Sequence, residues 1–453
     1  MHHLILQPPR AALRFTFTLL LLAGAVPCAL SQTQAGNGTE GSFRHYLSVV
    51  EQNNLDLQQQ RETVVSAQAG VSIAGVRPDP QFTAGIDSKE LYGPNKPNAG
   101  TTTIAGLAFT IETAGKRDAR IRAAESNVRL ADATADAFRR QLLADSATAF
   151  IEACRSSAAL QRHETSLGAM RDIVRANEIR FKAGDIGKLE LVQSKVEADR
   201  FGTDVVSARA DASAAQTALS VFLGQPYQQI LGSSPDCQFQ QNRPDTQEQT
   251  AAGLDGMVQK ALENREDVLL AKSGIANAGD NISLARANRS VDPVINVGIK
   301  NTPRIYPAFD AAGNPSNTPA EHSNSLGLTV TIPIPLSRLQ SGELVQAQSA
   351  LTQAQLQMRS VRLKAEAEVR STYVQYQAAT QNLYSYQQHV LADAESMLAG
   401  VRLSYRKGSA SLLDLLNAQR TADDVYLAYL QALSNWANAS VKLQQSTGKQ
   451  PEI

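Results

Sequence analysis

One glycine-centred hairpin motif occurs twice in this chain, and that duplication limits the possible folds more than any other feature. The stretch Tyr405–Gln419, YRKGSASLLDLLNAQ, falls on Phe181–Lys195, FKAGDIGKLELVQSK, at a shift of 224 positions. In both copies a basic helix end meets a glycine, Gly184 or Gly408, and an apolar, acid-bearing helix follows a few residues later. Glycine readily adopts the left-handed backbone that ends a helix, so each copy predicts a helical hairpin.

The duplication extends over most of the chain. The segments NNLDL and NREDV correspond at a shift of 211, and the Asp-Pro pairs at Asp79 and Asp292 correspond at 213. Both halves also end alike, with LGQP around Gly224 and TGKQP around Gly448. We therefore predict two repeats of about 200 residues, with the larger insertions in the second half's long loop. The expected parts are a signal peptide (1–31), a first repeat (32–224), a linker or strap (225–252), a second repeat (253–448) and a tail (449–453).

The N-terminus has the pattern of an export signal. Arg10 and Arg14 precede an apolar run from Phe15 to Ala25, and we expect cleavage after Ser31. No later run is apolar and long enough to form a spanning helix. The residues before Cys28 fit a lipid-attachment motif poorly, so we do not expect lipidation there.

Composition argues against nucleic acid and against catalysis. The 43 basic residues equal the 43 acidic residues, and no strongly basic block stands out. The six histidines are dispersed without the spacing of a metal site, and no phosphate-binding loop is present. We therefore expect a protein that is not an enzyme and has no cofactor. Cys154 and Cys237 remain after export, and their spacing does not decide between a disulfide and two free thiols.

Each half contains two segments in which apolar and polar residues alternate, as in strands with one apolar face. The apolar positions are Phe82, Ala84 and Ile86; Ala105, Leu107, Phe109 and Ile111; Ile295, Val297 and Ile299; and Leu326, Leu328, Val330 and Ile332. Strands of roughly 9 to 12 residues are long enough to cross a bilayer when tilted. Four strands cannot close a pore, and a spanning sheet cannot leave an edge in lipid, so they must combine with strands of other chains.

The proline-free segments predict helices of matched length. Lys116–Lys182 and Arg338–Lys407 would each form one helix of about 67 to 70 residues, near 100 Å long. The shorter helices expected in each half sum to the same length: Ser42–Val76 with Leu189–Phe222, and Gly253–Arg289 with Leu412–Gln445. We infer parallel columns of equal height, one continuous and one split near the middle.

The returning helices have the same heptad-like seam in both halves. Its members are Leu415, Ala418, Ala422, Val425, Tyr429, Ala432, Trp436, Ala439 and Leu443, matched by Leu191, Ser194, Ala198, Phe201, Val205, Ala208, Ala212, Ala215 and Leu219. Trp436 belongs to this seam, so we expect it to pack rather than to bind a ligand.

A duplicated unit of short helix, two membrane strands, long helix, glycine hairpin and short helix resembles the TolC family of outer-membrane efflux ducts over essentially the whole mature chain. The segments FKAGDIGKLEL and YRKGSASLLDLLNAQ look like the tip hairpins of that family. The segment FTIETAGKRDAR, Phe109–Arg120, with its partner PIPLSRLQSGELVQAQ, Pro333–Gln348, is also specific, and ETAGKR resembles the heavy-metal (cobalt-zinc-cadmium) branch.

The resemblance implies a mainly α fold with membrane β structure, with four strands and six long or short helices per chain. Three chains would form a twelve-stranded β-barrel in the outer membrane of a Gram-negative bacterium and a twelve-helix tunnel through the periplasm. The implied partners are a periplasmic adaptor and an inner-membrane pump of the resistance-nodulation-division type. The pump would supply the energy, and the duct a passive path with a gate at its inner end.

The resemblance also places functional residues at the hairpin tips. The expected adaptor-docking residues are Gly184, Asp185, Ile186 and Gly187, with Gly408, Ser409, Ala410 and Ser411. The expected entrance constriction holds Asp414 and its counterpart Glu190, with Asn417 and Gln193 at a second position. Because Asn417 replaces a residue that is acidic in some relatives, we expect one acidic ring rather than two. The alternatives are that the tip residues only turn the chain and that Asp414 is an ordinary solvated helix residue.

Two other functions fit the same sequence. A type I secretion duct would use this fold with a different pump, since a shared fold leaves the cargo open. A non-channel coiled-coil surface protein would have similar helices but no pore. Conductance in a planar bilayer would distinguish a duct from a coiled-coil surface protein that has no pore.

Overall fold

The computed structural model describes residues 42–88, 101–232, 236–237, 253–304, 307–309, 311–317, 321–334 and 342–453. The chain divides into two units, Met1–Gly38 and Thr39–Ile453, and all of the described residues belong to the second. The predicted signal peptide, Cys28 and most of the predicted strap lie outside them. None of the described helices has an apolar stretch of the length and hydropathy needed to cross a membrane.

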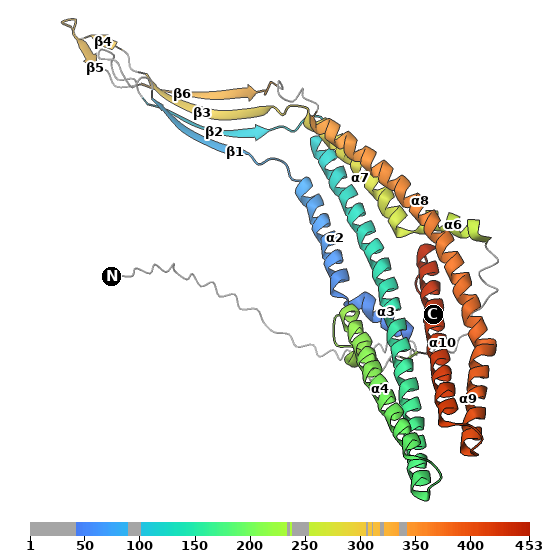
Figure 1. Ribbon diagram of the computed structural model, residues 1–453. Helices are drawn as coiled ribbons and strands as arrows, with labels where there is room; N and C mark the ends of the chain where they lie inside the picture. Colours follow the sequence, from blue (N-terminus) through green and yellow to red (C-terminus); the bar gives the residue numbers. More distant parts are fainter. Residues whose placement is uncertain are drawn as a thin grey trace, which may run out of the picture. The chain divides into compact units, whose positions relative to one another are not determined.

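The first half contains one continuous helix beside two shorter columns. Its helices are α1 (Phe43–Asn53), α2 (Leu55–Ala74), α3 (Lys116–Ala183) and α4 (Lys188–Leu223). The long helix α3 packs against both α2 and α4, as Figure 1 shows. The expected pairing of a continuous column with a split one is therefore confirmed.

The second half repeats this order with one interruption, a π-helix within its long helix. Its helices are α6 (Gly253–Asn264), α7 (Glu266–Asn288), α8 (Gly342–Ser385), the π-helix η2 (Tyr386–Val390), α9 (Leu391–Arg406) and α10 (Leu412–Ser446). A short α5 (Gln228–Leu231) lies in the linker. The helix α8 packs against α7 and α10, and both of these also pack against α3.

The π-helix marks a one-residue insertion in the second repeat. Before it, the buried positions Leu142, Ser146 and Ala153 of α3 match Ala365, Val369 and Tyr376 of α8 at a shift of 223. Beyond it, the two tip glycines match at 224. One wide turn absorbs an extra residue while the helix continues, so the same faces stay buried on both sides of η2. The predicted uninterrupted α-helix over Arg338–Lys407 is wrong in this respect.

Each half also has a break that the sequence analysis did not predict, because Ser42–Val76 and Gly253–Arg289 were each expected to form one helix. In the first half Asn54 is extended, caps α2 by accepting a bond from the amide of Leu57 (2.9 Å), and donates Nδ2 to the carbonyl of Phe222 (3.0 Å). In the second half Arg265 is extended and donates Nη1 to the carbonyl of Ser446 (3.1 Å). The last carbonyls of a helix have no hydrogen-bond partner within that helix. Asn54 and Arg265 each donate to such a carbonyl at the end of the returning helix in their own half.

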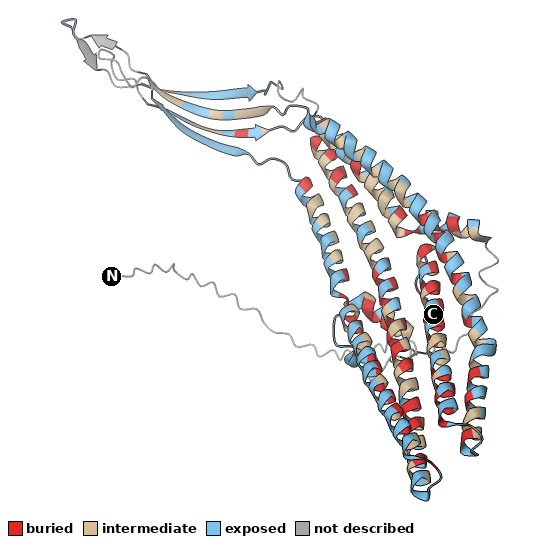
Figure 2. Ribbon diagram, in the orientation of Figure 1, coloured by how far each residue is buried: buried red, intermediate tan, exposed pale blue. Residues whose placement is uncertain are grey.

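Four strands form one antiparallel sheet in the order β1 (Gln81–Ser88), β2 (Thr101–Thr110), β3 (Val294–Arg304) and β6 (Glu321–Thr331). A small hairpin of β4 (Pro307–Phe309) and β5 (Pro315–Asn317), which was not predicted, lies between β3 and β6 in sequence. One cross-strand row holds Phe82, Leu107, Val297 and Leu328, and the next row holds Thr83, Gly106, Gly298 and Gly327. Directly opposed residues point to the same face, so the predicted apolar face and small or polar face are confirmed. Most of the sheet is exposed in the single chain (Figure 2).

The segment around ETAGKR joins the sheet to the helices. Its turn uses left-handed backbone at Ala114 and Gly115 (φ 53° and 64°). Lys116 pairs with Asp292, which lies just before β3 (Nζ to Oδ2, 2.6 Å). Burial raises the pKa of the Asp292 carboxyl, but the hydrogen bonds from Lys116 and Thr113 outweigh burial, so the pKa is lowered. Arg120 pairs with Glu112 and donates to carbonyls at the end of α2. The motif thus fixes the start of α3 against α2 and β3.

The largest apolar core lies where the returning helices end. It includes Tyr46 of α1, Phe150 of α3, Leu219 of α4 and Trp436 of α10, all buried. Trp436 therefore packs as predicted. Cys154 of α3 and Cys237 of the linker form a disulfide beside this core. The question that the spacing left open is thus answered, and the bond fixes the linker to α3.

Candidate functional site at the two hairpin tips

The two tips are built in the same way. Gly184 and Gly408 adopt positive φ angles of 83° and 75°. At the first tip Asp185 donates its amide to the carbonyl of Arg180 (2.8 Å), and at the second Ser409 donates its amide to the carbonyl of Ser404 (2.9 Å). These bonds close the helix C-termini as in a Schellman motif, so the glycines are needed for the turn itself.

The predicted docking residues are mostly exposed. Gly184, Asp185 and Gly187 are exposed at the first tip, as are Gly408, Ser409 and Ser411 at the second. Ile186 is instead buried, and Ala410 is half-buried against the apolar cluster above the tip. These two side chains hold the turns in place, so the surface that a partner can reach is glycine, hydroxyl and carboxylate.

Asp414 caps the second returning helix. Its carboxylate accepts bonds from the Ser411 hydroxyl (2.7 Å) and amide (3.0 Å), while its own amide donates to the Ser411 hydroxyl (3.1 Å). This reciprocal capping box lowers the pKa of the exposed Asp414, chiefly through the Ser411 side chain. Asp414 is therefore more than a solvated acid, since it starts α10. The first tip has no such box, because Gly187 stands at the corresponding place.

The predicted entrance residues differ in exposure and are not joined to one another by hydrogen bonds or ion pairs in the described part of the chain. Glu190 is half-buried, whereas Asp414, Asn417 and Gln193 are exposed. Among the described contacts, no hydrogen bond or ion pair joins Glu190 to Asp414. One chain contributes a single Asp414, so a ring of this residue requires copies from different chains.

Tyr405 connects the two hairpins near their tips, a role that the sequence analysis missed. Its hydroxyl lies 2.8 Å from Oδ1 of Asn177 on α3 and 3.1 Å from Oε1 of Glu190 on α4. One hydroxyl proton serves one acceptor, and Nδ2 of the buried Asn177 has no partner. With the Asn177 amide turned over, Nδ2 would donate to the hydroxyl and leave its proton for Glu190. The sequence held one sign of this role: at the equivalent position the first copy of the hairpin has Phe181, and only the second copy has a hydroxyl, on Tyr405.

A buried polar cluster joins the hairpins further from the tips. Asp423 on α10 accepts bonds from Arg162 (Nε, 2.7 Å) and Ser166 (2.7 Å) of α3 and from Gln419 (2.9 Å) of its own helix. Arg402 of α9 donates to Gln419 (2.5 Å), and burial lowers the pKa of its guanidinium. Heptad spacing alone gave no sign of this cluster, because its members flank the apolar seam.

A further ion pair spans the two returning helices. Arg420 of α10 binds Glu197 of α4 through two nitrogens, at 2.9 and 2.5 Å. With Tyr405 and Asp423, it gives three polar links between the hairpins on the tip side of the main core. The second hairpin is thus held to the first by directional contacts as well as by apolar packing.

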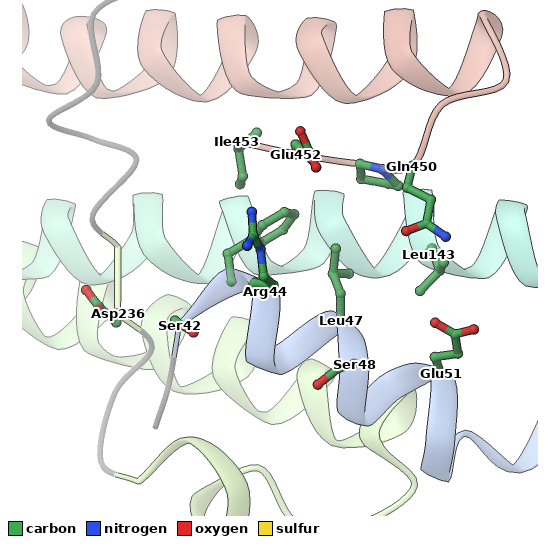
Figure 3. Close-up of a pocket in the computed structure, with 12 residues that line it drawn as sticks. Ser42, Arg44, Leu47, Ser48, Glu51, Leu143, Asp236, Gln450, Glu452 and Ile453 are labelled. Atoms are coloured by element: carbon green, nitrogen blue, oxygen red, sulfur yellow. The ribbon is translucent and has the colours of Figure 1, made fainter. Parts of the chain in front are cut away.

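A separate pocket of about 430 Å³ contains none of the tip residues in its lining. Figure 3 shows the side chains that line it. Its walls are α1, the linker at Asp236 and the final residues Gln450–Ile453, with Leu143 of α3 also lining it. Gln444 holds the last segment by two bonds to the backbone of Glu452 (2.7 and 2.9 Å). No group of three metal-binding side chains gathers among the described residues.

The amphipathic sheet joined to long, hairpin-ended helices defines a channel protein of the bacterial outer membrane. The sequence matches the family described as "Outer membrane efflux protein" over residues 46–225 and 257–449, and the chain belongs to this TolC-like family. Membership confirms that the chain is an outer-membrane efflux channel extending into the periplasm and that it is not an enzyme. It also sets aside the alternative of a non-channel surface protein.

Known relatives are distant in sequence and close in fold. The cobalt-zinc-cadmium resistance protein CzcC of Cupriavidus metallidurans is 23% identical over 403 residues, 89% of each chain. The outer membrane efflux protein BepC of Brucella suis is 26% identical over 299 residues, 65% of this chain and 60% of its own. Among solved structures, the outer membrane protein VceC of Vibrio cholerae has a TM-score of 0.67 at 19% identity, covering 90% of this chain and 97% of its own. The Neisseria gonorrhoeae MtrE channel in its open state has a TM-score of 0.67 at 17% identity, covering 90% and 89%.

Proposed function

We propose that three copies of this chain form a duct with a twelve-stranded barrel and a twelve-helix tunnel, which conducts substrates passively out of the periplasm. The observation that supports it is the four-stranded sheet, which has one apolar face and ends in the edge strands β1 and β6. In lipid those edges need partners, and closure with other copies provides them. Purified trimer in a planar bilayer should give discrete channel openings. Absence of conductance would refute the duct.

The polar face of the sheet suits a water-filled lumen. The row Thr83, Gly106, Gly298 and Gly327 places three glycines side by side. A Cβ at Gly106 would lie 2.9 Å from the carbonyl oxygen of Val297, so the sheet leaves no room on that face there. A sheet with one small or polar face and one apolar face suits a barrel that has water inside and lipid outside.

We further propose that the tips dock a periplasmic adaptor that belongs to a pump of the resistance-nodulation-division type. The exposed backbone at Gly184, Gly187 and Gly408 allows a partner to approach closely. Gly187→Trp, at a tip glycine whose φ of −78° accepts a side chain and whose Cβ would meet nothing within 4 Å, should leave trimer assembly intact and abolish export. The matched control is Gly400→Trp, an exposed glycine of α9 that also faces open space. Equal export by the two variants would refute docking at the tip.

The entrance charge is assigned to Asp414. Hydrogen bonds from Ser411 favour the ionised form of its carboxylate, and three such groups around a narrow entrance would attract cations and repel anions. Asp414→Asn should reduce the cation preference measured from reversal potentials, while Asp211→Asn, at an exposed residue of α4 farther from the tip, should not. An unchanged reversal potential would remove Asp414 from the constriction.

For the cargo we propose heavy-metal cations. The support is the ETAGKR segment together with the similarity to the resistance protein CzcC. A deletion strain should become sensitive to zinc, cobalt or cadmium, and the intact gene should restore growth. Unchanged growth on all three metals, with sensitivity to organic toxicants instead, would contradict this cargo.

A further inference from the structure

We propose that Lys300 gives the duct an anion-attracting ring near the outer end of its barrel, with one ammonium from each of three copies. This inference rests on the trimeric duct proposed above and adds a second charge filter, opposite in sign to the one assigned to Asp414. The ligands that such a ring attracts are small multivalent anions that carry phosphate or carboxylate groups.

Lys300 lies on the polar face of the sheet. It follows Gly298, a member of the row of three glycines, by two residues, and side chains two apart on a strand point to the same face. Its partners across the strands are Ile104 on β2 and Ser325 on β6. The intervening Ile299 belongs to the apolar face. In a barrel with lipid outside, the side chain of Lys300 therefore points into the lumen.

The opposite face of the sheet shows how far along the barrel Lys300 lies. The apolar row that contains Ile299 is followed, away from the helices, by a row that is polar on three of its four strands, at Thr103, Asn301 and Asn324. The two asparagine side chains are hydrogen-bonded to each other (2.6 Å). A change from apolar to polar side chains on the lipid face marks the edge of the membrane-spanning band. Lys300 lies between these two rows, so its ring stands at the outer end of that band.

The charge of Lys300 is not neutralised within the described part of the sheet. Its side chain is exposed, and none of the described contacts joins its ammonium to a carboxylate. The polar face does carry an acid, Asp87 of β1, in the next row outward, where the hydroxyls of Thr102 and Thr302 lie 3.5 Å apart. Asp87 is exposed as well and is two strands from Lys300, about 10 Å across the sheet. In a trimer the two residues therefore form separate rings of opposite charge.

The surroundings of Lys300 leave its field open to the lumen. On the helix side the neighbouring row holds Gly106, Gly298 and Gly327, which have no side chains to cover the ammonium. Water with 0.1 M salt screens charges over about 10 Å, and water with 0.01 M salt over about 30 Å. Anions should therefore gather beside the ring and cations should be repelled there, more strongly at low salt.

A cysteine in place of Lys300 tests the ring within one folded channel. For Lys300→Cys in a planar bilayer, the permeability ratio of cations to anions should rise on the order of twofold at 0.1 M salt. Labelling with the cationic reagent aminoethyl methanethiosulfonate should restore the reversal potential of the parent. The anionic sulfonatoethyl reagent should move the potential further toward cation preference. Native Cys154 and Cys237 are bonded to each other and do not compete for the reagents.

The matched control is Thr103→Cys, at an exposed residue of the opposite face that pairs with Asn301. Neither reagent should change the reversal potential of this variant. An equal response at the two positions, or no response at position 300, would overturn the ring and leave the duct in place. Absence of conductance in the parent would overturn the duct itself.

A relocated lysine tests the ring without chemical labelling. In the Lys300→Met channel, Ser325→Lys places an ammonium in the same row on the next strand and should restore the reversal potential of the parent. Thr103→Lys, on the other face, should not restore it. Asp87→Asn alone should move the potential in the direction opposite to Lys300→Met. Equal effects of the two added lysines would overturn the ring.

Inorganic triphosphate tests whether the ring holds anions. Added on the side of the bilayer that the outer end of the barrel faces, it should reduce the current through the parent channel at 0.01 M salt. The same concentration should have less effect on Lys300→Met. Equal block of both channels would overturn anion binding at Lys300.

Discussion

Removing the carboxylate of Asp423 tests how strongly the second hairpin is held to α3. Asp423 is buried and accepts three hydrogen bonds, from Arg162, Ser166 and Gln419. Asp423→Ala leaves the guanidinium of Arg162, whose side chain is only 15% exposed, without its main partner. Breaking a buried pair from one side costs about 3–5 kcal/mol. Glu395 remains 3.8 Å from Arg162 and is largely solvated, so we expect a loss near the lower end, about 3 kcal/mol.

The assay uses the chain's only tryptophan. Trp436 lies on the same helix and is buried, so its fluorescence follows the separation of α10 from its neighbours during guanidinium unfolding. Protein concentration must be equal for all variants, because the stability of an oligomer depends on it.

A double-mutant cycle separates the pair from general damage. The cycle uses Arg162→Met and Asp423→Leu, made singly and together; removing both charges should restore most of the stability that Asp423→Leu alone loses. The coupling between the two positions should lie within about 0.5–3 kcal/mol. Independent effects, or a cost of Asp423→Ala below about 1 kcal/mol, would refute the view that this cluster secures the hairpin.

Three further changes test other parts of the fold. In Gly224→Ala the new Cβ would lie 2.6 Å from the carbonyl oxygen of Asn53, at a φ of 68°. The unfolding midpoint of this variant should fall further than that of Gly184→Ala, where φ is 83° and a Cβ would meet nothing within 4 Å. Equal shifts of the two midpoints would contradict the close approach at Gly224. The pKa of Asp292 is lowered because hydrogen bonds from Lys116 and Thr113 outweigh burial, so this carboxylate contributes stability above its ordinary pKa that is lost as the pH falls through the lower folded value. Asp292→Asn should therefore flatten the acid limb of a stability profile, and an unchanged limb would argue against it. Cys237→Ser opens the disulfide across 83 residues and should lower the unfolding free energy by about 2–4 kcal/mol, measured against the oxidised parent; no change would mean that the linker is held by other contacts.

Local patterns were enough to predict the elements. Glycine at 184 and 408, the proline-free lengths of the long helices and the strict alternation of the strands each specify backbone geometry over a few residues. The family resemblance then supplied the order of the parts. The same patterns say little about where a side chain finds a distant partner.

Several of the features that escaped prediction depend on such partners. Asn54 and Arg265 are compatible with a helix, and each chain break is stabilised by a carbonyl about 170 to 180 residues further along the sequence. The π-helix was missed because the repeat was measured at the hairpins, where the shift is 224, and not within the long helices. Tyr405 was recognised as the start of a hairpin, and only the structure shows that its hydroxyl reaches Asn177 and Glu190.

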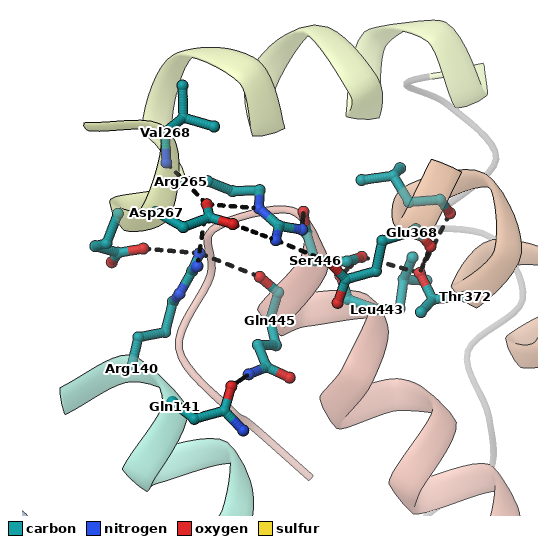
Figure 4. Close-up of polar contacts among 12 residues, drawn as sticks. Arg140, Gln141, Arg265, Asp267, Val268, Glu368, Thr372, Leu443, Gln445 and Ser446 are labelled. Carbon is teal, nitrogen blue, oxygen red and sulfur yellow. Dashed lines mark hydrogen bonds and ion pairs between the residues drawn. The ribbon is translucent and has the colours of Figure 1, made fainter. Parts of the chain in front are cut away.

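The break in the second half is centred on a charged residue, Arg265, whereas its counterpart in the first half is the neutral Asn54. The difference follows from the number of helices that each residue joins. Arg265 donates to Asp267, Glu368 and the carbonyl of Ser446, and Arg140 adds a pair from the first half of the same chain. Charges so arranged are brought together as the chain folds, with several hydrogen bonds to offset their loss of water. The pairs drawn in Figure 4 join α3, α7, α8 and the end of α10. Asn54 of the first half instead makes two neutral hydrogen bonds, with the amide of Leu57 and the carbonyl of Phe222, and joins only α2 to the end of α4.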